Sequence, residues 1–439
     1  MRIGILPSST RLDGGTYQYG LTMMNSLRQM NMDDDFVVFH RPITDLPLDH
    51  LAGQRWETIL LGVEQGCTSF RSSGLNVLRR IAGEGVMRKL WRKVRHRFFP
   101  PPPNESPRYL SGDFDTITYR WNWKRWLERQ GIELMIYLDI STLSFETGIP
   151  YIMTVYDLQH RLQPEFPEVS AEGEWERREY FFRNGTRYAT LILVDSEVGK
   201  EDVLEFYGPY GVTPDKVKVL PSLPANYHCN DIPEEEEQRI RKAYSLPDRY
   251  LFYPAQFWPH KNHFRIVQAL GMLREDHHFE IHLVLVGSYT GKIRERTFRE
   301  VMSLASKLGI EQQIHYLGYV PDQDMPALYS GAVALVMPTF FGPTNIPILE
   351  AWSFGCPALT SDIRGIREQV GDAGFLVNPR SVEAIADGIQ QLWNDYGLCK
   401  DLANRGRQRL LTYTPEDCRR RLTKILEEAK ERVRQTGSK

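Results

Sequence analysis

The sequence contains few cysteines, and they are not placed for a disulfide framework. The five cysteines lie at positions 67, 229, 356, 399 and 418, are odd in number and include no CxxC pair. The small disulfide-rich class of secreted domains is therefore excluded, and we interpret the cysteines as free thiols in a reducing compartment. Histidines, cysteines and carboxylates also show no metal-ligand spacing, so we expect no metal or other cofactor.

Long apolar runs and an excess of charge are lacking as well. No stretch approaches the roughly 18 to 20 uninterrupted apolar residues of a transmembrane helix, and the apolar N-terminus is too short for a signal peptide. Lys and Arg number 54 against 56 Asp and Glu, a net charge of −2, which argues against a nucleic-acid partner. With 41% hydrophobic residues, the 439-residue chain suits two or three globular domains. We expect the protein to be cytoplasmic.

Short apolar runs alternate with helical patterns along almost the whole chain. The runs are mostly apolar instead of alternating with polar residues, which is typical of parallel strands covered on both faces. The sequence therefore predicts an α/β chain with two doubly wound parallel sheets. The predicted strands are 3–6, 36–39, 58–61, 134–137, 151–155, 191–194, 250–253, 281–286, 314–316, 332–337, 358–360 and 374–377.

A proline-rich segment, 221–233, marks the boundary between the two predicted domains. We assign residues 1–228 to an N-terminal acceptor-side domain and 229–412 to a C-terminal domain. The remaining residues, 413–439, are predicted to form a final helix.

Residues 66–126 interrupt the first domain and include a strongly basic stretch. From Arg71 to Arg97 there are nine basic residues against one acid, Glu84. A helix over 86–98 would place its apolar residues on one face, which is typical of a helix on an anionic membrane surface. The alternative is a helix packed on the domain with its charges solvated. The residues predicted to touch a membrane or a lipid-linked acceptor are Arg88, Trp91, Arg92, Lys93 and Arg95.

The segment most informative about chemistry follows the predicted strand 332–337. A Pro/Gly loop leads into a helix predicted to begin at Ile346 or Pro347, so backbone N–H groups and the positive helix end can converge on a phosphate. Glu350, about one turn into the helix, can accept hydrogen bonds from two adjacent hydroxyls, as on a ribose. The alternative is a plain strand-to-helix connection whose Glu complements the helix dipole.

This segment resembles the nucleotide-sugar signature of the family-4 retaining glycosyltransferases (glycosyl transferases group 1), which have the GT-B fold. The family has Glu-Gly-Phe-Gly, a second Glu eight residues after the first, and then Ala-x-x-x-Gly-x-Pro. Glu350 matches the second Glu, and Ala351, Gly355 and Pro357 match the tail. At the first Glu, which holds hydroxyls of the donor sugar in the family, this chain has Gly342. The resemblance leaves that task to Thr344 or Asn345.

Other blocks of the second half follow the same resemblance. The family has an Arg and a Lys that face the diphosphate; Lys261 matches the Lys, whereas Gln256 stands at the Arg position. The alternative for Lys261 is a solvated surface lysine. The loop with Tyr319 and Val320 resembles the one that holds the nucleotide base, and Gly287 resembles a residue that closes the same crevice.

The first half matches more weakly. Tyr156, Asp157 and His160 follow a predicted strand, at the edge where open α/β sheets bind ligands. The family has His-Asp near the transferred sugar, and this chain has Tyr156 where the His would stand. A loop histidine such as His160 also fits a purely structural role. Gly14 and Gly15 resemble glycines beside the donor phosphate, and the absence of a GxGxxG motif disfavours a nicotinamide enzyme.

The resemblance implies two Rossmann-like domains that face a central cleft, with the final helix packed back on the first domain. It implies a hexosyltransferase-type enzyme (EC 2.4) that moves a sugar from a nucleotide diphosphate sugar to an acceptor hydroxyl with retention. The catalytic candidates are Tyr156, Asp157, His160 and Lys261. The donor-binding candidates are Gly14, Gly15, Gln256, Lys261, Gly287, Tyr319, Val320, Gly342, Pro343, Thr344, Asn345, Ile346 and Glu350.

The expected partners are a nucleotide sugar, a glycan or lipid-linked acceptor, and an anionic membrane surface at the inner face of the cell membrane. Such a transferase would act in polysaccharide, lipopolysaccharide or glycolipid assembly. Gly342 and Gln256 also fit a non-catalytic GT-B module that partners an active transferase. A nucleotide-sugar epimerase is a third reading.

Overall fold

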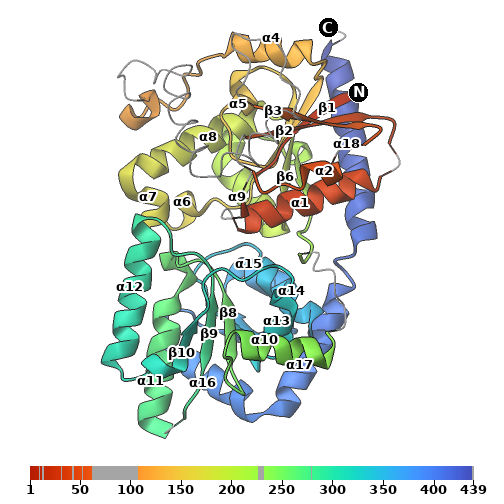
Figure 1. The fold of residues 1–439 in the computed structure, drawn as a ribbon. Coiled ribbons are helices and arrows are strands. Elements are labelled where there is room, and N and C mark those ends of the chain that lie inside the picture. Colours follow the sequence, from red (N-terminus) through yellow and green to blue (C-terminus); the bar gives the residue numbers. More distant parts are fainter. Residues whose placement is uncertain are drawn as a thin grey trace, which may run out of the picture.

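The computed structural model describes residues 1–437 except 9, 12–13, 31, 42–43, 52, 62–106, 226–231 and 278. Two parallel sheets lie one above the other in Figure 1, each covered by helices. The first sheet has seven strands in the order β3-β2-β1-β4-β5-β6-β7, and the second has six in the order β10-β9-β8-β11-β12-β13. Both sheets contain the strand order of the Rossmann fold. Successive strands are added on one side of β1 or β8, and then, starting with β4 or β11, on its other side.

The first domain consists of the first sheet and the helices around it. Its strands are β1 (Arg2–Leu6), β2 (Asp35–His40), β3 (Trp56–Leu60), β4 (Leu134–Tyr137), β5 (Tyr151–Thr154), β6 (Leu191–Val194) and β7 (Val217–Val219). Its helices include α1 (Gly15–Arg28), α2 (Leu48–Leu51), α4 (Trp121–Arg129), α5 (Leu143–Glu146), α6 (Gln159–Leu162), α7 (Pro167–Ser170), α8 (Glu174–Tyr188) and α9 (Glu197–Tyr207).

The second domain repeats this arrangement. Its strands are β8 (Leu251–Pro254), β9 (Leu283–Val286), β10 (Ile314–Tyr316), β11 (Ala334–Met337), β12 (Ala358–Ser361) and β13 (Phe375–Val377). Its helices are α10 (Glu234–Ala243), α11 (His263–His277), α12 (Lys292–Lys307), α13 (Met325–Ser330), α14 (Ile346–Ser353), α15 (Arg364–Val370), α16 (Val382–Asn394) and α17 (Tyr396–Leu410), with a short 3-10 turn at Pro259–Lys261.

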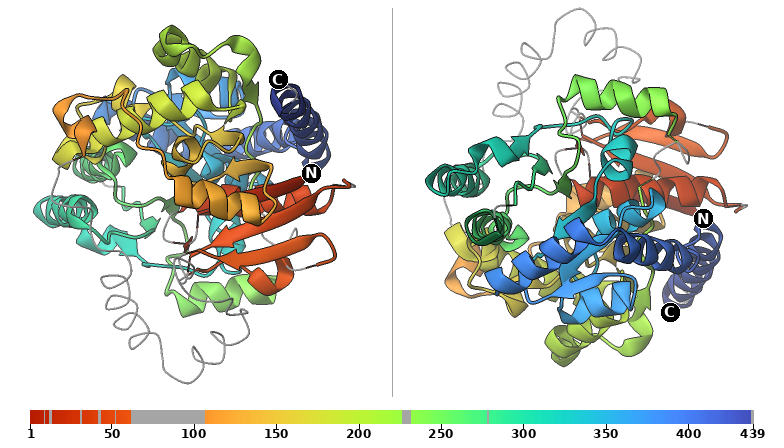
Figure 2. Two further views of the ribbon diagram at one scale, coloured as in Figure 1. Left: turned by 90° about the horizontal axis from the view of Figure 1, so that it is seen from above. Right: turned by 90° about the horizontal axis from the view of Figure 1, so that it is seen from below.

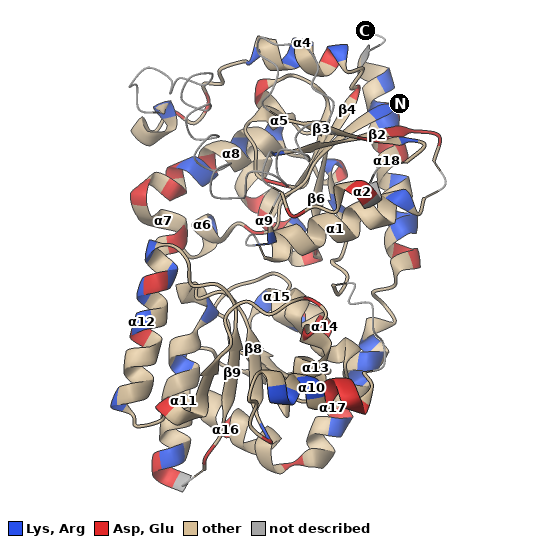
Figure 3. Ribbon diagram, viewed as in Figure 1, with Lys and Arg blue, Asp and Glu red and all other residues tan. Residues whose placement is uncertain are grey.

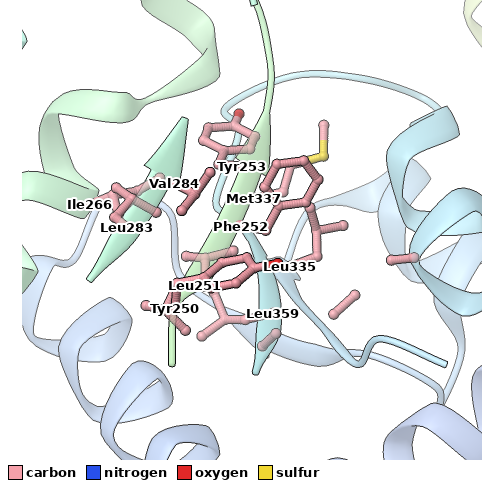
Figure 4. Packing of buried hydrophobic residues seen from close by; sticks show 14 of the residues in the cluster. Tyr250, Leu251, Phe252, Tyr253, Ile266, Leu283, Val284, Leu335, Met337 and Leu359 are labelled. Atoms are coloured by element: carbon pink, nitrogen blue, oxygen red, sulfur yellow. The ribbon is translucent and has the colours of Figure 1, made fainter. Parts of the chain in front are cut away.

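The core of the second domain explains why its strands are continuously apolar. Leu251 and Phe252 of β8 point to opposite faces of the sheet and are both fully buried, in one cluster with Ile266, Leu283, Leu335 and Leu359 (Figure 4). A strand buried on both faces excludes polar residues from both. This is the pattern from which the doubly wound sheets were predicted, and the prediction is confirmed.

Each of the twelve predicted strands is present, with ends that differ by one or two residues in most cases. The sequence analysis missed β7, which has only three residues and includes the half-buried Lys218. An edge strand of this length is paired on one side only, so it needs no apolar run. Its partner is β6, where Ile192 is in register with Val217.

The last helix, α18 (Pro415–Gly437), leaves the second domain and packs against the first (Figures 1 and 2). Leu422 and Leu426 are buried in one cluster with Ile5 and Met24. At the far end of α18, Lys430 Nζ lies 2.7 Å from a carboxylate oxygen of Asp34 and forms an ion pair with it. The chain therefore crosses between the domains twice.

Most of the basic segment lies outside the described residues, including Arg88, Trp91, Arg92, Lys93 and Arg95. Within the part of the chain that the structure describes, no helix is long and apolar enough to span a bilayer.

Candidate active site

The two domains meet through loops that follow the carboxyl ends of their strands. Gln163 Nε2, after β5, donates to the Phe340 carbonyl oxygen, after β11, at 2.9 Å. Glu368 on α15 accepts from the backbone N–H groups of Glu197 and Val198 at 2.9 and 3.0 Å. Ligands of open α/β sheets bind outside this edge, where the strand order reverses. A ligand-binding site is therefore expected where the loops of the two domains face each other.

Lys261 and Asn345 meet at the reversal point of the second sheet. Lys261 ends the 3-10 turn after β8, and Asn345 immediately precedes α14, after β11. Lys261 Nζ donates to Asn345 Oδ1 at 3.4 Å, and the Tyr253 hydroxyl donates to the Lys261 carbonyl oxygen at 2.8 Å. One cation and one amide are thus held at the N-terminal end of a helix, a position that favours anions.

Burial perturbs the lysine. The pKa of Lys261 is lowered to about 8, chiefly because the ammonium group loses solvation, while the carboxylates of Asp157 and Glu168 act in the opposite direction. Asp157 accepts from Arg178 Nη1 at 3.0 Å, and Glu168 accepts from His260 Nδ1 at 2.7 Å. Both carboxylates belong to the first domain, so the environment of Lys261 is completed across the domain boundary.

Gly342 stands where the family has its first Glu, and its backbone explains why no side chain is present. Its φ is +142°, which L side chains rarely adopt, and a Cβ there would lie 2.6 Å from Asn345 Nδ2. The Asn345 amide therefore occupies the space that a side chain at 342 would enter. Asn345 Nδ2 is buried and has no hydrogen-bond partner.

The backbone of the loop corrects one expectation. The Asn345 N–H donates to Gln369 Oε1 at 2.8 Å, and Gln369 Nε2 returns a bond to the Asn345 carbonyl oxygen at 2.9 Å. The predicted start of the helix at Ile346 is confirmed. However, the N–H of Asn345, in the loop whose N–H groups were expected to converge on a phosphate, is bonded within the protein. Pro343 lies against Gly365, where a Cβ would come 2.5 Å from the Pro343 carbonyl oxygen.

Thr344 reaches the first domain. Its hydroxyl donates to Asp195 Oδ2, and Asp195 Oδ1 accepts from the hydroxyl of Ser196 at 3.0 Å. Burial raises the pKa of Asp195 to about 6. Ser196 caps α9 by accepting from the Gly199 N–H at 3.0 Å. The sequence analysis missed Asp195, because a carboxylate after a strand gives no local signal of a partner in another domain.

Glu350 is 5% exposed and lies one turn into α14. The Tyr329 hydroxyl, from α13, donates to Glu350 Oε2 at 2.5 Å and so fixes the carboxylate. This hydrogen bond connects the neighbouring helices α13 and α14. Fixing a carboxylate in this way reduces the entropy it would lose on binding a diol.

Gln256 and Gly14 face each other across the domain boundary. Gly14 has a φ of +64°, and a Cβ there would lie 3.2 Å from Gln256 Nε2, whereas a Cβ at Gly15 would meet nothing within 4 Å. Gly287 has a φ of +141°, and its Cβ would lie 2.4 Å from the Ala255 carbonyl oxygen. The lack of a side chain thus lets Gln256 lie close to the backbone at Gly14 and lets the backbone of Ala255 lie close to Gly287.

Tyr319 is 58% exposed, and Val320 beside it is buried. Arg11 Nη1, from the loop after β1, donates to the Tyr319 hydroxyl at 3.0 Å and lies 3.6 Å from an Asp322 carboxylate oxygen. The sequence analysis did not identify Arg11. It connects the predicted base-binding loop to the first domain.

Two of the first-half candidates have internal roles. His160 is fully buried, its Nε2 lies 3.2 Å from the Tyr207 hydroxyl, and its ring stacks on Phe182. The expectation that His160 faces the sugar or acceptor is therefore not supported, because its side chain packs among helices of the first domain. The Tyr156 hydroxyl donates to the Leu138 carbonyl oxygen at 2.7 Å.

The chain is similar to known proteins both in sequence and in fold. Residues 234–409 match the family model of the glycosyl transferases group 1. The chain is 29% identical over 230 residues to the O-antigen chain mannosyltransferase B of Escherichia coli, covering 52% of this chain and 58% of that protein. It is 24% identical over 259 residues to the D-inositol 3-phosphate glycosyltransferase of Corynebacterium aurimucosum, covering 56% and 58%. The chain thus spans less than two thirds of the curated relatives it matches.

Solved structures match almost the whole chain. Anabaena Alr3699/HepE in complex with UDP-glucose superposes with a TM-score of 0.65 at 15% identity, covering 97% of this chain and 99% of that one. WaaG, a glycosyltransferase involved in lipopolysaccharide biosynthesis, gives 0.62 at 15% identity, covering 95% and 98%. The chain has the GT-B fold, and its residues 234–409 match the model of the glycosyl transferases group 1 family.

Proposed function

We propose that this protein is a retaining glycosyltransferase that moves a sugar from a nucleotide diphosphate sugar to an acceptor hydroxyl of a glycan or lipid-linked glycan. The observation that carries the proposal is the pairing of Lys261 with Asn345 at the N-terminal end of α14, with Glu350 one turn further on. Relatives named as mannosyltransferases favour a mannosyl donor and a role in cell-envelope polysaccharide assembly.

Each side chain has a distinct task in this proposal. The ammonium group of Lys261 and the positive end of α14 bind the diphosphate, whose charge grows as the glycosidic bond breaks. Glu350 accepts hydrogen bonds from the ribose hydroxyls. Asn345 Nδ2 donates to the donor sugar, because the amide fills the place of the family's carboxylate. Tyr319 and Val320 lie beside the base, and Asp157 faces the sugar.

We further propose that the leaving diphosphate is stabilised by these protein groups without a metal ion. Lys261 supplies a full charge in a site of low solvation, where electrostatic stabilisation is stronger than in water. Transfer that is equally fast with magnesium and with excess chelator supports this. Transfer that requires a divalent cation contradicts it.

Ligand binding tests the donor site. A panel of UDP, GDP, ADP, dTDP and their common sugars, GDP-mannose included, is screened by thermal shift, since binding to the native state raises the melting temperature. Glu350→Ala should abolish the shift that one nucleotide produces. Tyr329→Phe, which keeps the carboxylate and removes only its hydrogen bond, is the matched control and should retain most of it. No shift with any nucleotide refutes the donor site.

Gly342 and Gln256 motivate the alternative, a non-catalytic module that partners an active transferase. Turnover distinguishes the transferase from the non-catalytic module, because the module would bind the nucleotide sugar but release no nucleoside diphosphate. Nucleotide release with an epimerised sugar and no acceptor would instead indicate an epimerase.

We also propose that the first domain rests on an anionic membrane surface. Besides the basic stretch of the sequence, α4 carries basic residues (Figure 3), and the aromatic residues Tyr119 and Trp121 at its start are exposed. Trp121 is 60% exposed, stacks on Tyr119 with ring centroids 5.8 Å apart, and has Lys124 Nζ 5.7 Å from its centroid. Aromatic rings beside cations are typical of membrane interfaces.

Flotation with liposomes of phosphatidylglycerol tests this. Replacing Arg92, Lys93, Arg95 and Arg97 by Gln should weaken binding, and Trp121→Ser should weaken it further. Tyr396→Ser, at an exposed aromatic of the second domain, is the control. Binding unchanged by the first set contradicts the proposal.

A further inference from the structure

One carboxylate of the first domain lies against the loop of the second domain that carries Lys261. Glu168 belongs to α7, at the edge of the first domain that faces the second (Figure 1). Its Oε1 accepts from the backbone N–H of His260 at 3.1 Å and from His260 Nδ1 at 2.7 Å. Burial lowers the pKa of Lys261, the next residue, and the carboxylates of Asp157 and Glu168 oppose this shift. Glu168 therefore lies beside the lysine that the proposed function assigns to the diphosphate.

The second oxygen of this carboxylate is unused. The side chain of Glu168 is 5% exposed, and its Oε2 is buried without a hydrogen-bond partner. A buried carboxylate oxygen that has lost its water and gained no donor destabilises the fold. An amide at position 168 would also accept from His260 without burying a charge, so the contact with His260 does not explain a carboxylate there. A ligand that donates a hydrogen bond would satisfy this oxygen.

The loop before α14 offers an unpartnered donor beside the same lysine. Asn345 Oδ1 accepts from Lys261 Nζ at 3.4 Å, whereas Asn345 Nδ2 is buried and has no partner. An amide nitrogen only donates, and Gly342 of the same loop has no side chain that could accept. A sugar hydroxyl both donates and accepts, so a hydroxyl bound by Asn345 Nδ2 still has a proton to donate. Glu168 Oε2 is a suitable acceptor for it.

We infer that Glu168 Oε2 accepts a hydrogen bond from a hydroxyl of the transferred sugar, so that α7 of the first domain completes the donor-sugar site. The inference rests on the proposed function and assigns a specificity-determining residue to it. Glu168 acts on Lys261 together with Asp157, which the proposed function also places at the sugar. Because Oε2 is buried at the domain boundary, the nucleotide sugar reaches it when the two domains move apart.

Calorimetric titration with UDP-glucose, GDP-mannose, ADP-glucose and dTDP-glucose, each beside its nucleoside diphosphate, tests the assignment. For the donor that binds wild type, Glu168→Gln should lower the affinity at least about tenfold, the scale of a lost hydrogen bond to a charged group. Glu168→Ala, which also removes the contact with His260, should show the same loss. Affinity for the nucleoside diphosphate, which lacks the sugar, should change less than about twofold. Glu165→Gln, at an exposed carboxylate 3.9 Å from Arg380, is the control and should bind as wild type does.

Analogues of that donor that each lack a different hydroxyl of the sugar identify the contact. One analogue should bind wild type about tenfold more weakly than the full donor, but should bind Glu168→Gln within about twofold of it. Equal losses in both proteins overturn the inference, because the hydroxyl then does not meet Glu168. So does a Glu168→Gln variant that loses affinity equally for donor and nucleoside diphosphate, as a purely structural contact between the domains would.

The outcomes for wild type separate this inference from the proposed function. If wild type binds none of the four nucleotide sugars, the proposed function itself fails. If wild type binds one of them and Glu168→Gln binds it equally well, only this inference fails. A Glu168→Gln variant with unchanged donor affinity and a raised KM for the glycan acceptor would instead place Glu168 at the acceptor, and it also overturns the inference.

Discussion

Gly342→Ala tests whether the Asn345 amide has taken the place of a side chain at 342. The new Cβ would lie 2.6 Å from Asn345 Nδ2 and 3.1 Å from its Oδ1, so the amide must rotate away. Backbone strain at a φ of +142° costs about 1–3 kcal/mol. Loss of the 3.4 Å bond from Lys261 to Asn345 adds about 0.5–1.5 kcal/mol. We therefore expect the free energy of unfolding to fall by about 2–4 kcal/mol.

Two controls separate strain from collision. Gly211→Ala has a φ of +94° and nothing within 4 Å of the new Cβ, so it measures strain alone and should cost less. In the double variant Gly342→Ala/Asn345→Ala the colliding atoms are gone. Its cost should therefore be smaller than the sum of the two single variants by about 1 kcal/mol or more.

Urea denaturation of these variants gives the free energies. The nucleotide affinity of Gly342→Ala should also fall, because the displaced amide no longer faces the donor. A Gly342→Ala variant no less stable than Gly211→Ala refutes the reasoning. So does additivity of Gly342→Ala and Asn345→Ala within about 0.5 kcal/mol.

Two further predictions concern pH. The pKa of Asp195 is raised to about 6 in the folded protein from 3.8, so its protonated form stabilises the fold below pH 4 and that stabilisation is lost as the pH rises to 6. The free energy of unfolding of wild type relative to Asp195→Asn should decrease over this range, and a flat difference would contradict it. Lys261 has a pKa of about 8, so diphosphate affinity should be constant below pH 7 and fall above pH 8. Calorimetry should show that Lys261→Arg removes this fall; an unaltered pH profile in the variant would contradict the assigned role.

The sequence predicted the second domain better than the first for a physical reason. Strands such as β11 are buried on both faces and leave an apolar run, and the loop before α14 combines prolines and glycine in a recognisable order. Both signals are local. The short edge strand β7 has no such signal, because it is paired on one side only.

Site residues that act across the domain boundary could not be predicted from local patterns. Arg11, Glu168 and Asp195 each follow a first-domain strand, and their partners lie at least 90 positions away in the sequence. His160 shows the opposite error. Its position after a strand suggested a ligand, but its hydrogen-bond partner Tyr207 comes from the end of α9 and holds the ring inside the domain. Both the contacts across the two domains and the contact of His160 with Tyr207 depend on how the helices pack, which local sequence patterns do not show.

Release of nucleoside diphosphate from a nucleotide sugar tests the central claim most directly. Wild type is incubated with each donor sugar, with and without a glycan acceptor, and both the released nucleotide and the anomeric configuration of the product are measured. The account predicts release from one donor that depends on the acceptor, a product with the donor's configuration, and loss of both in Lys261→Gln. Binding of a nucleotide sugar without any release, or a product of inverted configuration, would contradict it.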